Sequence, residues 1–203
     1  MVTTRILLAE DQGMLRSALA SLLDVEPDME VVAQVGRGDE IVPAAVEHRP
    51  DVALVDIDLP GGSGLDALPD LARQAPDCTA IIVTTFARAG YLRRAMSAGA
   101  RGFLVKDDPV EQLAASIRRV LAGQVVVQPD LAVAALSAPA NPLTDREQEV
   151  LRASRDGAVV ADIAGRLYLS EQTVRNYLSA AIGKTGARNR AEALARAEDH
   201  GWV

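Results

Sequence analysis

The sequence predicts an α/β domain with a doubly wound parallel sheet, followed by a small all-α domain. Four short apolar runs, rich in Val and Ile and separated by segments of helical periodicity, are typical of parallel strands buried on both faces. Segments 145–157, 162–167 and 170–182 then show successive helical patterns with start and stop signals. A length of 203 residues and a hydrophobic content of 49% suffice for two compact domains.

Each apolar run ends in a polar residue suited to phosphoryl transfer. The runs and the residues that follow them are 6–9 with Glu10 and Asp11, 52–55 with Asp56, 80–83 with Thr84, and 102–105 with Lys106. In an open parallel sheet, ligands bind in the crevice beyond the carboxyl ends of the strands. We therefore expect three carboxylates, one hydroxyl and one ammonium group to converge on one site.

The expected site has the composition of a magnesium-dependent phosphoacceptor. Clustered carboxylates repel one another unless a cation neutralises them, and an all-oxygen set of ligands suits Mg²⁺. Glu10, Asp11 and Asp56 are therefore candidate Mg²⁺ ligands, and the Asp56 carboxylate is a candidate nucleophile that forms an acyl phosphate. Thr84 is expected to donate a hydrogen bond to the phosphoryl group, and Lys106 to supply a positive charge. A single acidic residue at a strand end is commonly a solvated loop residue, but matching strand ends favour a site.

Two helical segments of the first domain carry wide apolar stripes. Residues 14–23 and 110–121 have apolar side chains at three- and four-residue steps. Packing against the sheet is the simplest role of both stripes. Surplus apolar surface on these first and last helices would also form a dimer face.

Segment 123–141 interrupts the periodic pattern. It contains Gly and Pro among many small residues, which is typical of a linker, and a short helix is expected over 131–136. The predicted domains are therefore 1–122 and 142–203, joined by the linker 123–141.

Residues 1–122 resemble the receiver domain of bacterial two-component response regulators. The matching motifs are the pair Glu10-Asp11, the segment Asp56-Ile57-Asp58-Leu59-Pro60 with Gly61-Gly62-Ser63-Gly64, Thr84, and the segment 98–106 ending in Lys106. The resemblance implies a five-stranded flavodoxin-like fold, phosphorylation of Asp56, and Mg²⁺ bound by Glu10, Asp11, Asp56 and the backbone carbonyl of Asp58. It also implies that Thr84 and Phe103 form a switch pair that responds to the phosphoryl group near Lys106. Asp107 stands where the family often has Pro.

The second domain opens with a strong helix signal. Thr144 and Glu147 have the spacing of a capping box, in which each side chain hydrogen-bonds the backbone amide of the other residue. Gly157 marks the expected end of this helix. A second helix over 162–167 and a third capped by Ser170 have the spacing of a helix-turn-helix, whose second helix enters the DNA major groove.

Residues 143–201 resemble the LuxR-type DNA-binding domain. The matching segments are Leu143–Leu151, Ile163-Ala164, Leu169-Ser170, Thr173-Val174-Arg175, Lys184-Thr185-Gly186, Asn189-Arg190 and Ala191-Glu192-Ala193. Residues 1–122 carry a net charge of −6 and residues 166–196 a net charge of +4, within a chain of net charge −7. A phosphate-binding surface is therefore expected near the C-terminus.

The helical period assigns the expected DNA contacts. The inward stripe consists of Val174, Leu178, Ala181 and Ile182. The residues left on the opposite face are Gln172, Arg175, Asn176, Ser179 and Gly183. Arg175 is expected to pair with guanine and Asn176 with adenine. The expected phosphate contacts are Thr173, Tyr177, Lys184 and Arg190.

Two positions of this helix depart from the family pattern. The family frequently has His or another basic residue where Tyr177 stands, and a further basic residue where Ser179 stands. Each monomer is therefore expected to bind DNA weakly, which favours dimeric binding.

The sequence is identified as a member of the NarL/FixJ class of response regulators. We expect a cytoplasmic transcription regulator that a sensor histidine kinase phosphorylates on Asp56 and that binds double-stranded promoter DNA as a homodimer. It is not expected to be an enzyme beyond phosphorylation and dephosphorylation at Asp56. The single Cys78 fits a reducing compartment, and the apolar runs are too short to span a membrane. The N-terminus also lacks a signal-peptide pattern.

Two alternative functions compete with this assignment. The segment Asp56-Ile57-Asp58 also resembles the start of the Asp-x-Asp-x-Thr motif of haloacid-dehalogenase-type phosphatases, although Pro60 breaks the motif. In the second alternative, the receiver is a phosphorylation-independent dimerisation module of a DNA-binding regulator. The complete set of acidic, Thr and Lys residues argues against that alternative.

Overall fold

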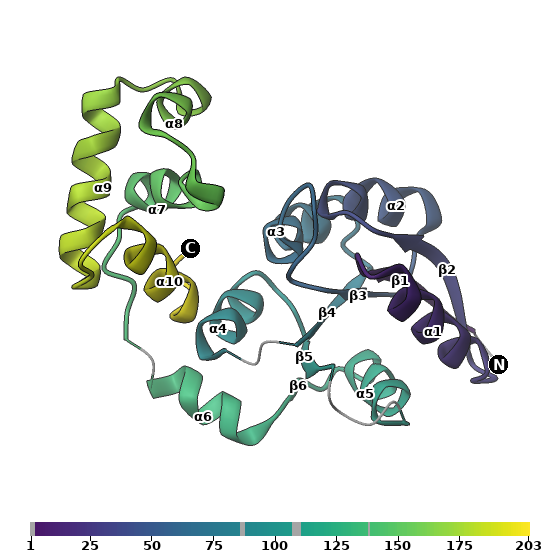
Figure 1. The fold of residues 1–203 in the computed structure, drawn as a ribbon. Helices are drawn as coiled ribbons and strands as arrows, with labels where there is room; N and C mark the ends of the chain where they lie inside the picture. Colours follow the sequence, from purple (N-terminus) through teal and green to yellow (C-terminus); the bar gives the residue numbers. More distant parts are fainter. Residues whose placement is uncertain (1–2, 86–87, 107–110, 138) are drawn as a thin grey trace. The chain divides into compact units, whose positions relative to one another are not determined.

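The computed structural model describes residues 3–85, 88–106, 111–137 and 139–203 (Figure 1). The chain divides into two compact units, residues 1–87 with 94–132 and residues 88–93 with 133–203. The first unit is built on a parallel sheet and the second is helical, which confirms the predicted fold class. In these ranges no helix is long and apolar enough to cross a membrane.

A six-stranded parallel sheet forms the centre of the first unit, with the strand order β2-β1-β3-β4-β5-β6. The strands are β1 (Thr4–Ala9), β2 (Met29–Val35), β3 (Val52–Val55), β4 (Thr79–Thr84), β5 (Gly102–Val105) and β6 (Val126–Val127). The four apolar runs are confirmed as β1, β3, β4 and β5. The predicted number of five strands is corrected to six, because β6 adds to the edge of β5, where the Val126 amide donates to the Arg101 carbonyl at 3.0 Å.

Helices flank both faces of the sheet. α1 (Gly13–Asp24) and α5 (Glu111–Leu121) lie on one face, and α2 (Ile41–His48) and α3 (Gly64–Gln74) lie on the other (Figure 1). α4 (Ala89–Ser97) leads into β5. Every residue of the central strand β3 is consequently buried, as expected of an apolar run covered on both sides.

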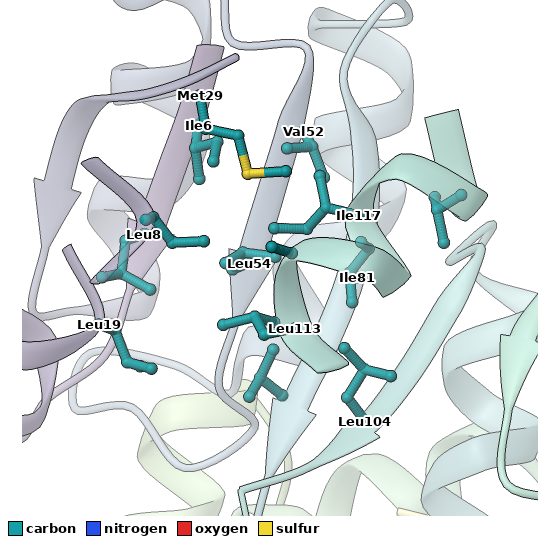
Figure 2. Packing of buried hydrophobic residues seen from close by; sticks show 14 of the residues in the cluster. Ile6, Leu8, Leu19, Met29, Val52, Leu54, Ile81, Leu104, Leu113 and Ile117 are labelled. Atoms are coloured by element: carbon teal, nitrogen blue, oxygen red, sulfur yellow. The ribbon is translucent and has the colours of Figure 1, made fainter. Parts of the chain in front are cut away.

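α1 and α5 supply the apolar side chains that cover one face of the sheet. Figure 2 shows Leu19 of α1 and Leu113 and Ile117 of α5 packed with Leu54 and Ile81 of the central strands. The core role of both predicted stripes is thereby confirmed for these residues.

The stripes also extend beyond the core. Met14 is 89% exposed, Leu22 46% and Leu121 39%. These side chains are the surplus apolar surface that the sequence predicts on the first and last helices. Val110, which the pattern assigns to the α5 stripe, lies outside the described residues, as does Asp107.

The segment assigned to the linker contains regular structure. β6 belongs to the sheet, and α6 (Pro129–Ser137) confirms the expected short helix and extends it at both ends. The domain boundaries at 122 and 142 stay a prediction.

The second unit contains the helix-turn-helix. Its helices are α7 (Asp145–Arg152), α8 (Val160–Leu167), α9 (Glu171–Thr185) and α10 (Arg190–Asp199). The capping box is confirmed, because the Thr144 amide donates to Glu147 Oε2 at 2.7 Å and the Glu147 amide donates to Thr144 Oγ1 at 3.4 Å. α7 ends at Arg152 and not at Gly157, since a 3₁₀ turn at Arg155–Gly157 follows the helix.

The helices of the second unit close around their own apolar core. Val174, Leu178 and Ala181 of α9 are buried in it together with Trp202 near the C-terminus. Trp202 also stacks on His200, with ring centroids 4.6 Å apart. The α9 helix, held in this way, presents one fixed face to solvent.

Candidate functional site

The carboxyl ends of β1, β3 and β5 bring Glu10, Asp56 and Lys106 together. Ala9 of β1 pairs with Val55 of β3, so the two acidic residues that follow them are neighbours. Lys106 Nζ lies 2.5 Å from Glu10 Oε2 and 2.7 Å from Asp56 Oδ2. The three side chains are at most 7% exposed, which makes these contacts buried ion pairs.

Backbone groups hold the two carboxylates in place. The Ile57 amide donates to Asp56 Oδ1 at 2.7 Å, and the Gln12 amide donates to Glu10 Oε1 at 3.1 Å. Each carboxylate therefore keeps one oxygen on a backbone amide and the other on Lys106. The Arg16 guanidinium donates to the backbone carbonyl of Glu10 and fixes the start of the loop after β1. Arg16 cannot be predicted from the sequence, because a lone basic residue early in a helix carries no distinctive signal.

Burial and pairing oppose each other in setting the protonation of the site. Burial raises the pKa of Asp56 above its usual 3.8 and that of Glu10 above 4.5, although hydrogen bonds from Lys106 counteract the shifts. Burial also disfavours the charge of Lys106, but its hydrogen bonds to Asp56 and Glu10 outweigh this effect and raise its pKa. The site thus favours a positive charge beside Asp56.

The acidic residues form a cluster that fits a hard divalent cation. Glu10, Asp11 and Asp56 each offer a carboxylate oxygen, and these oxygens lie within 4.8 Å of one another. Asp11 is exposed and Glu10 and Asp56 are buried, so the cluster opens to solvent on one side. Asp58 lies two residues after Asp56 in the loop that follows β3 and is exposed. Oxygen ligands at this spacing suit Mg²⁺.

Thr84 and Phe103 lie on the two strands next to this cluster. Thr84 ends β4 and is fully buried, and its carbonyl accepts a hydrogen bond from the Lys106 amide at 2.9 Å. Phe103 is fully buried in β5, where it pairs with Ile82 of β4 and Val127 of β6. The structure therefore places both residues as the sequence predicts, while their roles as a switch pair stay a prediction.

Gly64 allows α3 to pack closely against the loop that follows Asp56. A Cβ atom at Gly64 would lie 2.0 Å from the Asp56 carbonyl oxygen, so no side chain fits there. The Gly64 amide and the Ser63 hydroxyl both donate to the Ile57 carbonyl, at 3.0 Å each. The N-terminus of α3 is thereby packed against residues 56–58. Close approach of this kind cannot be read from one sequence, although the segment 61–64 was recognised as a motif.

The exposed face of α9 confirms the predicted helical period. All five residues assigned to this face are exposed: Gln172, Arg175, Asn176, Ser179 and Gly183. Arg175 pairs with Glu171 at 2.6 Å, and Gln172 Nε2 of the side-chain amide donates to Asn176 Oδ1 at 3.0 Å. These exposed contacts contribute little stability, so the same side chains are available to an incoming ligand.

The predicted phosphate contacts have structural partners. Lys184 Nζ lies 2.8 Å from Glu147 Oε2, and the Glu147 side chain is only 7% exposed. Arg190 donates to the Ala158 carbonyl at 2.7 Å, and the Thr173 hydroxyl lies 2.8 Å from that of Ser170. Tyr177 packs against the core of the unit. Lys184 therefore stabilises the capping box in addition to its predicted contact with DNA.

Cys78 has no place in either site. It is buried beside β4, and burial raises the pKa of its thiol to about 12. The thiolate that nucleophilic or redox chemistry requires is therefore strongly disfavoured.

Comparison with known proteins accounts for both units. Residues 6–118 match the response regulator receiver domain, and residues 141–197 match the luxR family of bacterial regulatory proteins. The transcriptional regulatory proteins YvfU and DesR of Bacillus subtilis (strain 168) are each 46% identical to the chain. YvfU covers 98% of this chain and DesR 97%, and the matches span 99% and 98% of those proteins.

A solved structure agrees over the whole length. The crystal structure of the response regulator ChrA, from a haem-sensing two-component system, is 30% identical and covers 100% of both chains with a TM-score of 0.57. The chain therefore belongs to the response regulators in which a receiver domain precedes a LuxR-family DNA-binding domain, and it is a DNA-binding transcriptional regulator.

Proposed function

We propose that a sensor histidine kinase transfers a phosphoryl group to Asp56 and that the phosphorylated chain binds promoter DNA as a homodimer. One observation carries the proposal: Lys106 contacts both Asp56 and Glu10 in a buried site at the carboxyl ends of three strands. Activation by phosphorylation is the general behaviour of the family. The proposed location is the cytoplasm, because a DNA-binding regulator acts where promoter DNA is found.

Each residue around Asp56 has a separate proposed role when Asp56 accepts a phosphoryl group. The Ile57 amide holds Asp56 Oδ1, which leaves Oδ2 to attack phosphorus. The bond from phosphorus to the nitrogen of the kinase histidine breaks as the new bond forms, and its electron pair stays on the leaving imidazole. Lys106, already paired with Oδ2, follows the negative charge onto the phosphoryl oxygens. The Thr84 hydroxyl then donates to one of these oxygens. As the Thr84 hydroxyl moves toward the phosphoryl group, the Phe103 ring moves with it, and the surface of the receiver changes.

Glu10, Asp11, Asp56 and the Asp58 carbonyl are the proposed ligands of Mg²⁺. When bound, the ion neutralises both the carboxylates and the phosphoryl oxygens. The spacing of the carboxylate oxygens supports this assignment, because it lets one cation contact all three side chains.

Labelling with a radioactive small phosphodonor in the presence of Mg²⁺ tests the phosphoacceptor. Asp56→Asn should abolish labelling, because the amide has the same shape but is a poor nucleophile. Asp58→Asn is the matched control, because it removes an exposed carboxylate two residues away and keeps the backbone carbonyl. Persistent labelling of Asp56→Asn would place the acceptor elsewhere. Glu10→Ala, Asp11→Ala and a chelator should each slow labelling, and an unchanged rate would remove the metal assignment.

We also propose that the chain has no enzymatic activity other than phosphorylation and dephosphorylation of Asp56. Steady turnover of a small phosphomonoester would instead support the haloacid-dehalogenase alternative. DNA binding that is equally tight for wild type and Asp56→Asn under phosphorylating conditions would support the phosphorylation-independent alternative.

The exposed face of α9 is the proposed DNA-reading surface. The proposed base contacts are Arg175, Asn176, Ser179 and Gln172, and the proposed phosphate contacts are Thr173, Tyr177, Lys184 and Arg190. The supporting observation is that every member of the first set is exposed, while Val174, Leu178 and Ala181 on the opposite face of α9 are buried and Ile182 is half-buried. Mapping of bound DNA with and without phosphorylation tests the surface and identifies the operator.

A further inference from the structure

Tyr168 has an unusual backbone conformation in the turn between α8 and α9. Its φ is 55° and its ψ is 43°, which is the left-handed region. Arg49 is the one other non-glycine residue with positive φ in the part of the chain that the structure describes. This region is disfavoured for side chains with a Cβ and is an outlier for bulky ones.

The fold of the unit gains nothing from an aromatic side chain at this position. Tyr168 caps α8 through its backbone amide, which donates to the Ala164 carbonyl, and Gly or Asn would do the same with less strain. The side chain is 95% exposed. Within the described residues, no side chain hydrogen-bonds its hydroxyl. Strain that the local structure does not require is a feature of functional positions.

The position of Tyr168 suggests what the side chain contacts. It lies two residues before Ser170, the N-cap of α9, and the exposed Gln172, Arg175 and Asn176 occupy the first turns of that helix. The N-terminal residues of a recognition helix contact base edges, so the turn leading into it lies near the sugar-phosphate backbone. A tyrosine there offers a flat apolar ring to a deoxyribose and a hydroxyl donor to a phosphate.

We propose that Tyr168 is a DNA-backbone contact, whose ring packs on a deoxyribose and whose hydroxyl donates a hydrogen bond to a phosphate oxygen. This inference rests on the proposed DNA binding by α9. A contact of this kind reads no base, so it strengthens binding to all sequences alike. Tyrosine is uncharged and displaces no counterion, so the salt dependence of binding does not depend on it.

Replacement by a residue that accepts the left-handed conformation tests the proposal in the full-length chain. Tyr168→Asn should raise the thermal unfolding midpoint of the second unit, which the fluorescence of the single Trp202 reports. The same variant should bind both operator and random duplex about three- to tenfold more weakly, with an unchanged salt slope. Tyr168→Phe keeps the ring and should lose about threefold.

Arg49→Asn is the matched control. It relieves the same type of strain at the end of α2 in the first unit, so it should leave DNA affinity unchanged. If Tyr168→Asn binds DNA as tightly as wild type, or loses affinity only together with a lower unfolding midpoint, the contact does not exist. Failure of the wild-type protein to bind any duplex, phosphorylated or not, would instead remove the proposed function itself.

Discussion

Glu147 links helix capping to the proposed DNA-binding surface. Its carboxylate accepts from the Thr144 amide at 2.7 Å and from Lys184 at 2.8 Å, so one buried group ties the start of α7 to the end of α9. Burial disfavours its charge, but the hydrogen bonds from Lys184 and Thr144 outweigh that effect and lower its pKa below 4.5. Glu147 therefore caps α7 and also holds the end of α9 in position.

The second unit should lose stability in acid because of Glu147. A carboxyl group with a lowered pKa in the folded state stabilises that state above its usual pKa of 4.5, and this contribution disappears as pH falls through the lowered value. Urea unfolding of the second unit, followed by Trp202 fluorescence, should show a falling midpoint below about pH 4.5. Glu147→Gln should reduce this dependence, and Glu149→Gln, which removes a half-exposed carboxylate from the same helix, should retain it. Equal acid sensitivity in wild type and Glu147→Gln would contradict the assignment.

At the scale of elements, α9 carries both proposed base contacts and proposed phosphate contacts, and substitutions distinguish the two kinds. Arg175→Ala should cost about 1–3 kcal/mol on the operator and relax the preference at one base pair, because a bidentate contact is lost. Lys184→Ala should weaken binding to all sequences alike and lower the salt slope by about one unit. Filter binding or fluorescence anisotropy over a salt series distinguishes the two outcomes.

Lys184 also has a structural role, because it forms an ion pair with Glu147. Its loss leaves the buried Glu147 carboxylate without a cation, so Lys184→Ala should also destabilise the second unit. Lys184→Arg keeps the charge and serves as the control for both effects. Arg175→Ala that weakens operator and random DNA equally would mean that Arg175 contacts the backbone and that α9 is rotated from the proposed orientation.

The strands that the sequence predicts correctly are those with a strong hydrophobic signal. β1, β3, β4 and β5 are continuous apolar runs, because central parallel strands are buried on both faces. β2 lies at an edge and mixes buried Met29 with exposed Glu30 and Gln34, so it resembles no such run. β6 has two residues, which is too short to show any period.

At the scale of the whole molecule, the sequence predicts the residues of the site better than the residues that hold them in place. Strand order brings Glu10, Asp56 and Lys106 together from positions far apart in the chain, and their residue types alone indicate the chemistry. Arg16 supports the site by donating to the backbone carbonyl of Glu10. Gly64 supports it because it has no side chain that would collide with the Asp56 carbonyl. Neither effect leaves a pattern in a single sequence, because both depend on how close two segments approach in the folded chain.

We propose the surplus apolar surface of α1 and α5 as the contact of the expected phosphorylated homodimer. Both helices lie on one face of the sheet, and Met14, Leu22 and Leu121 remain exposed after the core is formed. A closed two-fold pair is the commonest oligomer and buries the same patch from each copy. The face near Phe103 and Lys106 is an alternative dimer contact. It offers neither residue to a partner, since Phe103 is fully buried and the Lys106 side chain is 7% exposed.

Sedimentation of the chain with and without a small phosphodonor tests this dimer face. Leu22→Glu should leave the monomer folded, because Leu22 is already 46% exposed, and should lower the dimer fraction of the phosphorylated chain. Val46→Glu is the matched control, because Val46 is 48% exposed and lies on α2, across the sheet from α1. Phosphorylation should therefore drive dimerisation of the control but not of Leu22→Glu. If both variants dimerise like wild type, the apolar surface of α1 is not the contact, and the face near Phe103 and Lys106 takes its place.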